Sequence, residues 1–206
     1  MIRFADGAGE KEEFDLTSAV HSIFRAGGWL EETQGFEHRS EQSEMAKAVT
    51  RSLLDEQHLL FEAGTGVGKS LAYLIPSVLF SVSRKRPCVV ATNTISLQEQ
   101  LLDKDIPALR SLFEEVPELK NFKDFGCALL VGRANYLCTT RLHRALNGQG
   151  ELFEGRQRQE LERIAKWAGS EAKEGIRQEL SPSPMGTVWD AVSADSSLCS
   201  SKRCKP

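Results

Sequence analysis

The octapeptide AGTGVGKS, residues 63–70, combines closely spaced glycines with a lysine and a hydroxyl residue. Glycine tolerates the unusual backbone dihedrals that turn successive N–H groups inward around an anion. A lysine then neutralises phosphate charge, a serine hydroxyl can bind Mg²⁺, and the N-terminus of a following helix favours negative charge. An apolar run precedes the stretch and a helical pattern follows it, so the sequence predicts a phosphate-binding loop.

The predicted loop assigns a role to each of its residues. Lys69 is expected at the β- and γ-phosphates of ATP or GTP, and Ser70 on Mg²⁺. The residues expected to surround the nucleotide are Ala63, Gly64, Thr65, Gly66, Val67, Gly68, Lys69 and Ser70. Ala63 stands where the general pattern has glycine, and the alternative is a glycine-rich turn with a chance Gly-Lys-Ser.

A glutamine lies about twenty residues upstream, in the stretch FEHRSEQSEM. A carboxamide can donate and accept in one plane, which matches the N6/N7 edge of adenine. Gln42 is therefore a candidate for adenine recognition if its helix docks beside the loop. The alternative is a solvent-exposed glutamine at a helix start.

Strand and helix patterns alternate around the loop. Three short apolar runs, HLLFEAGTG, PCVVATNT and CALLVG, are each followed by a helical pattern, which indicates crossover connections and a parallel sheet. An α/β class is therefore expected. Before them, Leu16, Val20 and Phe24 mark a short amphipathic helix. After about Asn147 the alternation ends, and a helix (ELERIAKWAGS) precedes an irregular Pro/Ser/Gly-rich stretch, interpreted as an insertion or second unit.

The second apolar run ends in hydroxyl and amide side chains. Thr92, Asn93 and Thr94 would lie at the carboxyl end of a strand, where open α/β sheets bind ligands, so they could contact a nucleic-acid backbone. A simple helix cap by Thr94 or Ser96 explains them equally well.

The overall charge excludes a uniformly basic nucleic-acid-binding surface, since the chain has a formal net charge of −3. Local basic clusters remain, in SVSRKRP and around Arg156, Arg158, Arg163 and Lys166, with Tyr136 and Trp167 as aromatic neighbours. The longest apolar stretch is too short for a membrane span and contains Pro76. The first residues lack a signal-peptide pattern, so a cytoplasmic location is expected.

Five cysteines fall into two groups. Cys88 and Cys127 begin apolar runs and are expected to be small buried hydrophobic residues. Cys138, Cys199 and Cys204 lie outside such runs and are candidate ligands of zinc or an iron–sulfur cluster, each of which takes four ligands. The fourth ligand is expected beyond Pro206, and spare surface thiols are the alternative.

Taken in order, these motifs resemble the XPD/DinG-type superfamily 2 helicases that carry an iron–sulfur domain, and most closely their bacterial DinG-like branch. HRSEQSEM resembles the adenine-recognising segment, EAGTGVGKS the first helicase motif, and VVATNTISLQEQL a motif that touches the DNA backbone. GRANYLC and VWDAVSADSSLCSSKRC resemble the segments that carry cluster cysteines.

The resemblance implies a RecA-like parallel sheet with a mainly helical iron–sulfur insertion. It implies an N-terminal segment at 1–35, the first part of an ATP-binding motor domain at 36–133, and a cluster domain at 134–206. It also implies ATP and Mg²⁺ as ligands, Gln42 as the adenine reader, and a [4Fe–4S] cluster on Cys138, Cys199 and Cys204. The implied partner is single-stranded or forked DNA, traversed 5′→3′ by a monomer.

The sequence also departs from the family. It contains no Asp-Glu-Ala-His box, and its only similar string, LLDEQ, precedes the loop. The chain is therefore expected to be the N-terminal part of a longer helicase, to bind ATP weakly and not to hydrolyse it at a useful rate. The alternatives are a complete small P-loop enzyme, a zinc-binding nucleic-acid module, and a helicase fold whose cluster site is unused.

Overall fold

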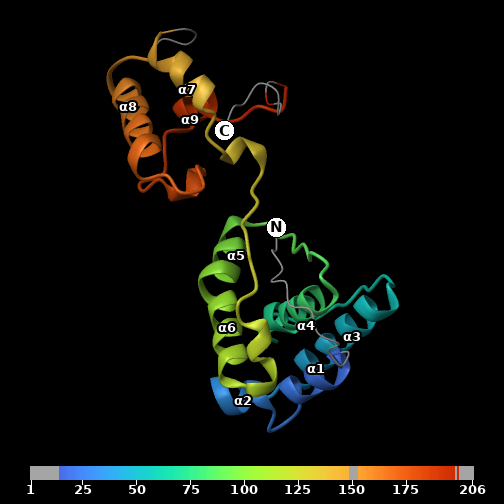
Figure 1. The fold of residues 1–206 in the computed structure, drawn as a ribbon. Coiled ribbons are helices and arrows are strands. Elements are labelled where there is room, and N and C mark those ends of the chain that lie inside the picture. Colours follow the sequence, from blue (N-terminus) through green and yellow to red (C-terminus); the bar gives the residue numbers. More distant parts are fainter. Residues whose placement is uncertain (1–13, 149–152, 198, 200–206) are drawn as a thin grey trace. The chain divides into compact units, whose positions relative to one another are not determined.

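A computed structural model of the chain describes residues 14–148, 153–197 and 199. The chain divides into two compact units, Met1–Leu129 and Leu130–Pro206. In each unit the described elements are helices joined by turns and extended segments (Figure 1). Among the described helices, none has both the length and the apolar character needed to cross a membrane.

The first unit is helical wherever the sequence shows a helical period. In chain order it contains α1 (Leu16–Phe24), α2 (Trp29–Gln34), α3 (Ser40–Asp55), α4 (Lys69–Arg84), α5 (Ile95–Gln100), the π-helical turn η1 (Leu101–Asp105), α6 (Ile106–Glu115) and the 3-10 helix η2 (Pro117–Phe122). The expected amphipathic helix at the start is confirmed as α1, whose Asp15 cap accepts a hydrogen bond from the Ser18 N–H at 3.0 Å.

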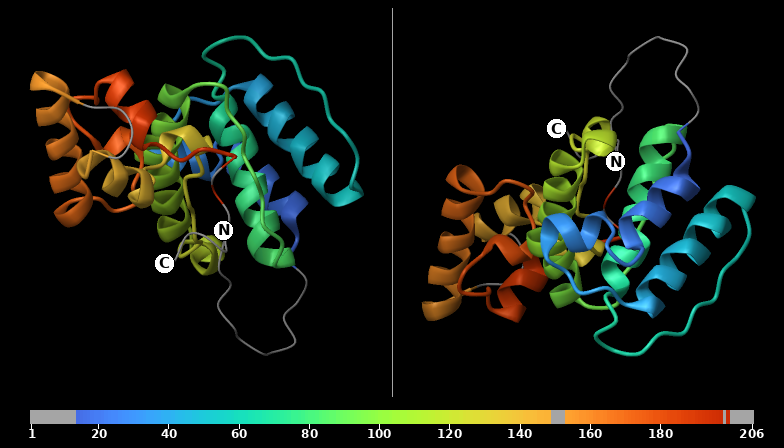
Figure 2. Two further views of the ribbon diagram at one scale, coloured as in Figure 1. Left: turned by 90° about the horizontal axis from the view of Figure 1, so that it is seen from above. Right: turned by 90° about the horizontal axis from the view of Figure 1, so that it is seen from below.

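Helix α4 forms the centre of the first unit. Its side chains are apolar around most of its circumference, and Leu74, Ile75 and Leu79 are almost completely buried. Helices α1 and α3 lie beside it (Figures 1 and 2), and the buried face of α6 belongs to the same core. The phosphate-loop sequence therefore leads directly into the most buried helix of the unit.

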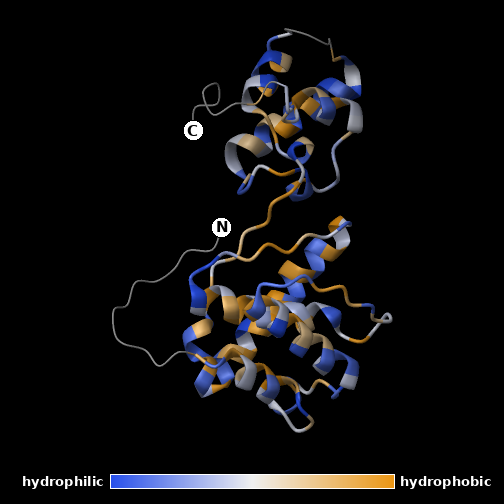
Figure 3. Cartoon of the chain, turned by 90° about the vertical axis from the view of Figure 1, so that its right-hand side faces the viewer, coloured by the Kyte–Doolittle hydropathy of each residue, from blue (hydrophilic) through white to orange (hydrophobic). Residues whose placement is uncertain are grey.

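The parallel sheet expected from the sequence is not found in the described residues. The three apolar runs are extended but pair with no neighbouring strand in that part of the chain, and Figure 3 shows hydrophobic colouring along extended segments. Leu60, Val89 and Leu130 are 99%, 85% and 73% exposed. A run of apolar residues becomes a strand only when another strand satisfies its backbone, and the described residues supply none.

The second unit has its own small core. It contains the 3-10 turn η3 (Arg133–Asn135), α7 (Thr139–Leu146), α8 (Gly155–Ser170), the 3-10 turn η4 (Arg177–Glu179) and α9 (Gly186–Val192). Its buried residues include Leu161, Ile164, Trp167 and Trp189. Trp167 is thus a core residue, 5% exposed, and not a free stacking surface.

Helix α9 corrects the expectation that the Pro/Ser/Gly-rich stretch is irregular throughout. The helix begins at Gly186, where the Met185 N–H donates to the Glu160 carboxylate at 3.2 Å. Val188, Trp189 and Val192 then turn into the core. A carboxylate from a different helix supports the start of α9, so the local sequence gives no sign of it.

Candidate functional site

The predicted phosphate loop connects an extended segment to α4. Gly66 and Gly68 adopt φ values of +81° and +79°, in the left-handed region that other residues rarely enter. A Cβ on Gly68 would lie 2.1 Å from the Gln42 amide nitrogen. The backbone therefore favours glycine at position 68, and any larger residue there would force the Gln42 side chain to move.

Three side chains bind the outward carbonyls of this loop. Lys69 Nζ donates to the carbonyls of Ala63 at 3.1 Å and Gly64 at 2.5 Å. The Gln42 amide nitrogen donates to the Gly68 carbonyl at 2.9 Å, and Arg39 donates to the Gly66 carbonyl. Carbonyls of alternate residues, 64, 66 and 68, are thus each held by a side chain.

The start of α4 is electropositive, in contrast to the loop carbonyls, because it presents backbone N–H groups. No side chain caps this helix, and its first backbone bond is from the Ala72 N–H to the Gly68 carbonyl, at 3.3 Å. The N–H groups before Ala72 therefore have no partner within the helix. In a sixteen-residue helix these groups and the helix dipole favour an anion at the position of Lys69 and Ser70.

Ser70 is also linked to the next turn of α4. Burial raises the pKa of the Tyr73 phenol above its usual value. A hydrogen bond with the Ser70 side chain partly offsets this rise in the pKa, and the negative charge of Asp105 adds to it.

A cavity of about 450 Å³ lies beside the loop. Its walls come from the segment before α3, from the start of α4, and from the helix that contains the π-turn. The lining residues are Phe36, Glu37, Arg39, Gln42, Gly68, Ser70, Leu71, Gln100, Lys104, Asp105 and Ala108. This volume falls within the range of small-molecule sites, and the wall mixes apolar groups with a few charged ones.

The cavity brings together Gln42, Gly68 and Ser70, which the sequence predicted as one site, and adds residues that it did not predict. Phe36, Lys104 and Asp105 are the main additions. Lys104 and Asp105 belong to the π-turn η1, and π-turns often occur at functional sites because they shift the helix register. A π-turn has no clear sequence signature, which explains why these two residues were missed.

The hydroxyl residues after the second apolar run form a helix cap. Thr94 Oγ1 accepts a hydrogen bond from the Leu97 N–H at 3.3 Å, and Thr92 Oγ1 donates to the Thr94 carbonyl at 3.2 Å. The capping interpretation is therefore confirmed, and a role of these residues in nucleic-acid contact stays a prediction.

The segment of Cys138 pairs with the stretch Val192–Ala194, five residues before Cys199. The Cys138 N–H donates to the Val192 carbonyl and the Ala194 N–H to the Tyr136 carbonyl, both at 2.8 Å. This short antiparallel pairing brings the Cys138 segment beside the chain that continues to Cys199. Cys204 lies outside the described residues, and the described residues contain no group of three or more potential metal ligands.

The remaining thiols differ from expectation. Cys127 is exposed and Cys88 is partly exposed, whereas both were expected to be buried. Both residues begin extended segments that pair with no strand in the described part of the chain, so no neighbouring strand there buries them.

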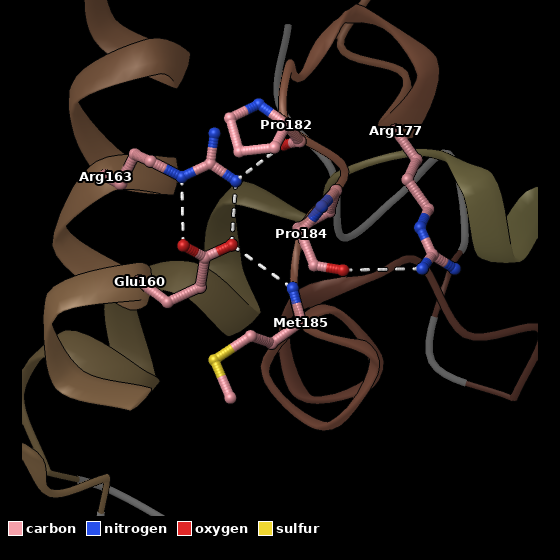
Figure 4. A network of polar contacts seen from close by, with 6 residues as sticks. All are labelled: Glu160, Arg163, Arg177, Pro182, Pro184 and Met185. Atoms are coloured by element: carbon pink, nitrogen blue, oxygen red, sulfur yellow. Dashed lines mark hydrogen bonds and ion pairs between the residues drawn. The ribbon is translucent and has the colours of Figure 1, made fainter. Parts of the chain in front are cut away.

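The local basic clusters are partly neutralised. Arg86 pairs with Glu56 at 2.6 Å, and in α8 Arg158 pairs with Glu162 at 2.9 Å. Arg163 binds the Glu160 carboxylate at 2.7 Å in the network of Figure 4. These arginines have structural partners, so the clusters are not bare surfaces for phosphate.

The loop, the N-terminus of α4 and the adjoining cavity together form one candidate binding site for an anionic ligand. No family profile matches the chain. In sequence, however, it is 38% identical over 181 residues to "ATP-dependent helicase DinG" of Mycobacterium tuberculosis (strain ATCC 25618 / H37Rv), covering 80% of this chain. It is 36% identical over 157 residues, 76% of the chain, to "ATP-dependent DNA helicase YoaA" of Haemophilus influenzae.

A third relative carries a different activity in its name. The chain is 30% identical over 162 residues, 78% of its length, to "3'-5' exonuclease DinG" of Bacillus subtilis (strain 168). The matches cover only 26%, 22% and 16% of the three relatives, so the chain spans about a quarter of their length or less. The chain is thus related in sequence to the DinG-type ATP-dependent helicases, and the resemblance read from its motifs is confirmed.

Proposed function

We propose that the first unit binds ATP with Mg²⁺ between the phosphate loop and the 450 Å³ cavity. The observation that carries this proposal is the hydrogen bond from Gln42 to the Gly68 carbonyl, because it joins the base-recognition segment to the loop. With its amide nitrogen held there, Gln42 keeps its oxygen Oε1 as an acceptor for the exocyclic amino group of adenine. Phe36, 41% exposed at the cavity, offers an apolar face to the base.

The loop residues supply the phosphate contacts in this proposal. Residues 63–68 present backbone N–H groups, and Lys69 exchanges its bonds to the Ala63 and Gly64 carbonyls for the phosphates. The Ser70 hydroxyl fits a Mg²⁺ ligand because it lies in the first turn of α4, the helix whose N-terminus would receive the phosphates. A bound Mg²⁺ would neutralise phosphate charge there.

We further propose that the protein acts as part of a 5′→3′ DNA helicase, a cytoplasmic monomer that moves along single-stranded or forked DNA. The names of the DinG and YoaA relatives support this proposal. The three extended apolar runs would then be strands of a RecA-like parallel sheet, formed once neighbouring strands pair with them. Each run is extended and leads into a helix or helical turn, as such a sheet requires.

The second unit is proposed to hold a [4Fe–4S] cluster through Cys138, Cys199 and Cys204. The backbone pairing that brings the Cys138 segment beside the chain that continues to Cys199 fits this donor set, although three thiolates do not complete a four-ligand shell. When bound, the cluster would cross-link the Cys138 segment to the chain after α9. Metal analysis tests the assignment: iron with acid-labile sulfide supports it, whereas zinc or no metal contradicts it.

The ATP proposal is tested by the variant Gln42→Glu. A carboxylate cannot donate to the Gly68 carbonyl, so the bridge is replaced by repulsion between two oxygens. We expect MgATP binding to weaken by tenfold or more, which is about 1.4 kcal/mol or more. The control Gln57→Glu makes the same charge change at an exposed position after α3. Equal MgATP affinity in both variants would contradict the proposal.

A further inference from the structure

Two side chains bind backbone carbonyls of the phosphate loop, whereas the N–H groups are the ones expected to bind an anion. Gly66 and Gly68 are both left-handed, and alternation of dihedral sign along a short loop turns N–H groups to one side. The carbonyls of the same two residues are bound from α3, by Arg39 and Gln42. These two contacts leave the N–H side available, and ligand binding does not need to break them.

Lys69 differs from this pair. Its ammonium binds the Ala63 and Gly64 carbonyls and is also the group expected to reach the phosphates, so its contacts must break when the ligand arrives. Arg39 and Gln42 are therefore the contacts that can keep the loop in shape both before and after binding. Of these two, Gln42 is already assigned to the base, whereas nothing in the proposed function uses Arg39.

The position of Arg39 suits such a role. It is the residue that immediately precedes α3, and the buried Ser43 N–H binds its backbone carbonyl at 3.1 Å. Its backbone is thus fixed to the helix while its guanidinium reaches the Gly66 carbonyl, twenty-seven residues along the chain. A guanidinium carries five donors on a planar group, so one contact to the loop leaves others for the cavity wall that Arg39 also lines.

We propose that Arg39 is a positioning residue that preforms the phosphate loop by holding the Gly66 carbonyl, and that it supports triphosphate binding without regard to the base. This proposal rests on the proposed nucleotide site. It separates two tasks within one segment: Gln42 recognises adenine, and Arg39 shapes the loop for the phosphates.

The first test compares ligands with and without a base. Arg39→Ala is expected to weaken the binding of MgATP, MgGTP and magnesium tripolyphosphate by the same factor, about tenfold, as expected for loss of one charged hydrogen bond. Arg39→Lys, which keeps a cationic donor, should recover part of the loss. A loss confined to MgATP would mean that Arg39 contacts the base and would overturn the proposal.

The matched control is Arg51→Ala. Arg51 is an exposed arginine on α3, twelve residues further on and therefore roughly 18 Å away along the helix. Its removal changes the net charge equally but leaves the loop contacts intact, so tripolyphosphate affinity should stay within about twofold of the unchanged chain. An equal loss in both variants would show a general charge effect and would refute a specific role for Arg39.

The second test needs no ligand. In the free chain, Arg39→Ala should lower the backbone ¹⁵N order parameters of residues 64–69 while those of α6 stay unchanged, and Arg51→Ala should do neither. Unchanged order parameters at the loop would overturn the proposal even if affinity fell, because Arg39 would then act on the ligand directly. Failure of the unchanged chain to bind any of the three ligands would instead contradict the proposed nucleotide site.

Discussion

At the scale of single residues, Gly68 affects both the backbone conformation of the loop and the contact that the loop makes with Gln42. It ends the loop, precedes α4, and carries on its carbonyl the bond from Gln42. Its positive φ is strained for any other residue, and a Cβ would lie 2.1 Å from the Gln42 amide nitrogen, so the Gln42 side chain would have to move. A change at this residue should therefore affect the fold locally and the site at once.

We expect Gly68→Ala to destabilise the chain by about 1–3 kcal/mol, because a non-glycine residue at positive φ is strained and Gln42 must move. Gly64→Ala is the folding control, since a Cβ there meets nothing within 4 Å. Thermal denaturation of the two variants measures the difference. Equal stability of both would show that the loop does not adopt this conformation in solution.

Predictions for single residues succeeded where the spacing of residue types along the chain indicates a local backbone conformation. The glycines, Lys69 and Ser70 identified the loop, and Gln42 was expected beside it, which the structure shows. Lys104 and Asp105 could not be predicted, because a π-turn brings them to the cavity. Cys127 was expected to be buried, and its exposure follows from the missing strand partners.

At the scale of elements, the carboxylate of Glu160 links α8 to the start of α9 within the second unit. One carboxylate on α8 binds Arg163 at 2.7 Å and the Met185 N–H at 3.2 Å, and Arg163 also donates to the Pro182 carbonyl at 2.9 Å (Figure 4). These bonds tie α8 to the start of α9. They lower the pKa of Glu160, with the Arg163 hydrogen bond as the largest cause.

Replacement of Glu160 by glutamine should cost about 1–2 kcal/mol near neutral pH, through loss of charge-assisted hydrogen bonds. Because folding lowers the pKa of Glu160, its contribution is complete above the usual value of 4.5 and is lost as pH falls through the lower folded pKa. The stability gap between the two proteins should therefore close in acid. Fluorescence-monitored unfolding suits the measurement, since Trp167 and Trp189 are buried here.

The matched control for this unit is Glu162→Gln. Glu162 also pairs with an arginine on α8, but its side chain is 59% exposed, so the expected cost is below about 0.5 kcal/mol. A gap between Glu160→Gln and the unchanged chain that does not narrow as the pH falls would argue against the charged network as its source.

The extended apolar runs make a second prediction at this scale. Leu60 is 99% exposed, so Leu60→Ser removes no buried surface and should change stability by less than about 0.5 kcal/mol while reducing self-association. Leu74→Ala, at a 4% exposed position in α4, should cost about 2–5 kcal/mol. Unfolding and light-scattering measurements test both. A large loss of stability from Leu60→Ser would show that the run is covered, as in a formed sheet.

Helices were predictable from sequence because their hydrogen bonds and amphipathic faces are local. Helices α1, α3, α4 and α8 follow from apolar spacing alone. The predicted strands depend on partners elsewhere in a sheet, and α9 depends on Glu160 from another helix. Sequence patterns therefore described the helical elements well and the non-local ones poorly.

At the scale of the whole molecule, we expect the chain to bind ATP without hydrolysing it. The 206 residues contain no Asp-Glu-Ala-His box, and the similar string at 53–57 lies at the end of α3, where Glu56 pairs with Arg86. We therefore assign no carboxylate among the described residues to orient the water that would attack the γ-phosphate. We expect the 206-residue chain to bind MgATP without steady turnover, as measured by phosphate release with and without single-stranded DNA. Sustained phosphate release would refute this expectation.

The most direct test of the account is a titration of the 206-residue chain and its Lys69→Ala variant with MgATP. Lys69 opens α4 and is the cation expected at the phosphates. We predict saturable binding of one MgATP per chain that is lost, or weakened by at least tenfold, in the variant. Equal affinity in the two proteins, or no saturable binding by the unchanged chain, would contradict the claim that this loop is a nucleotide site.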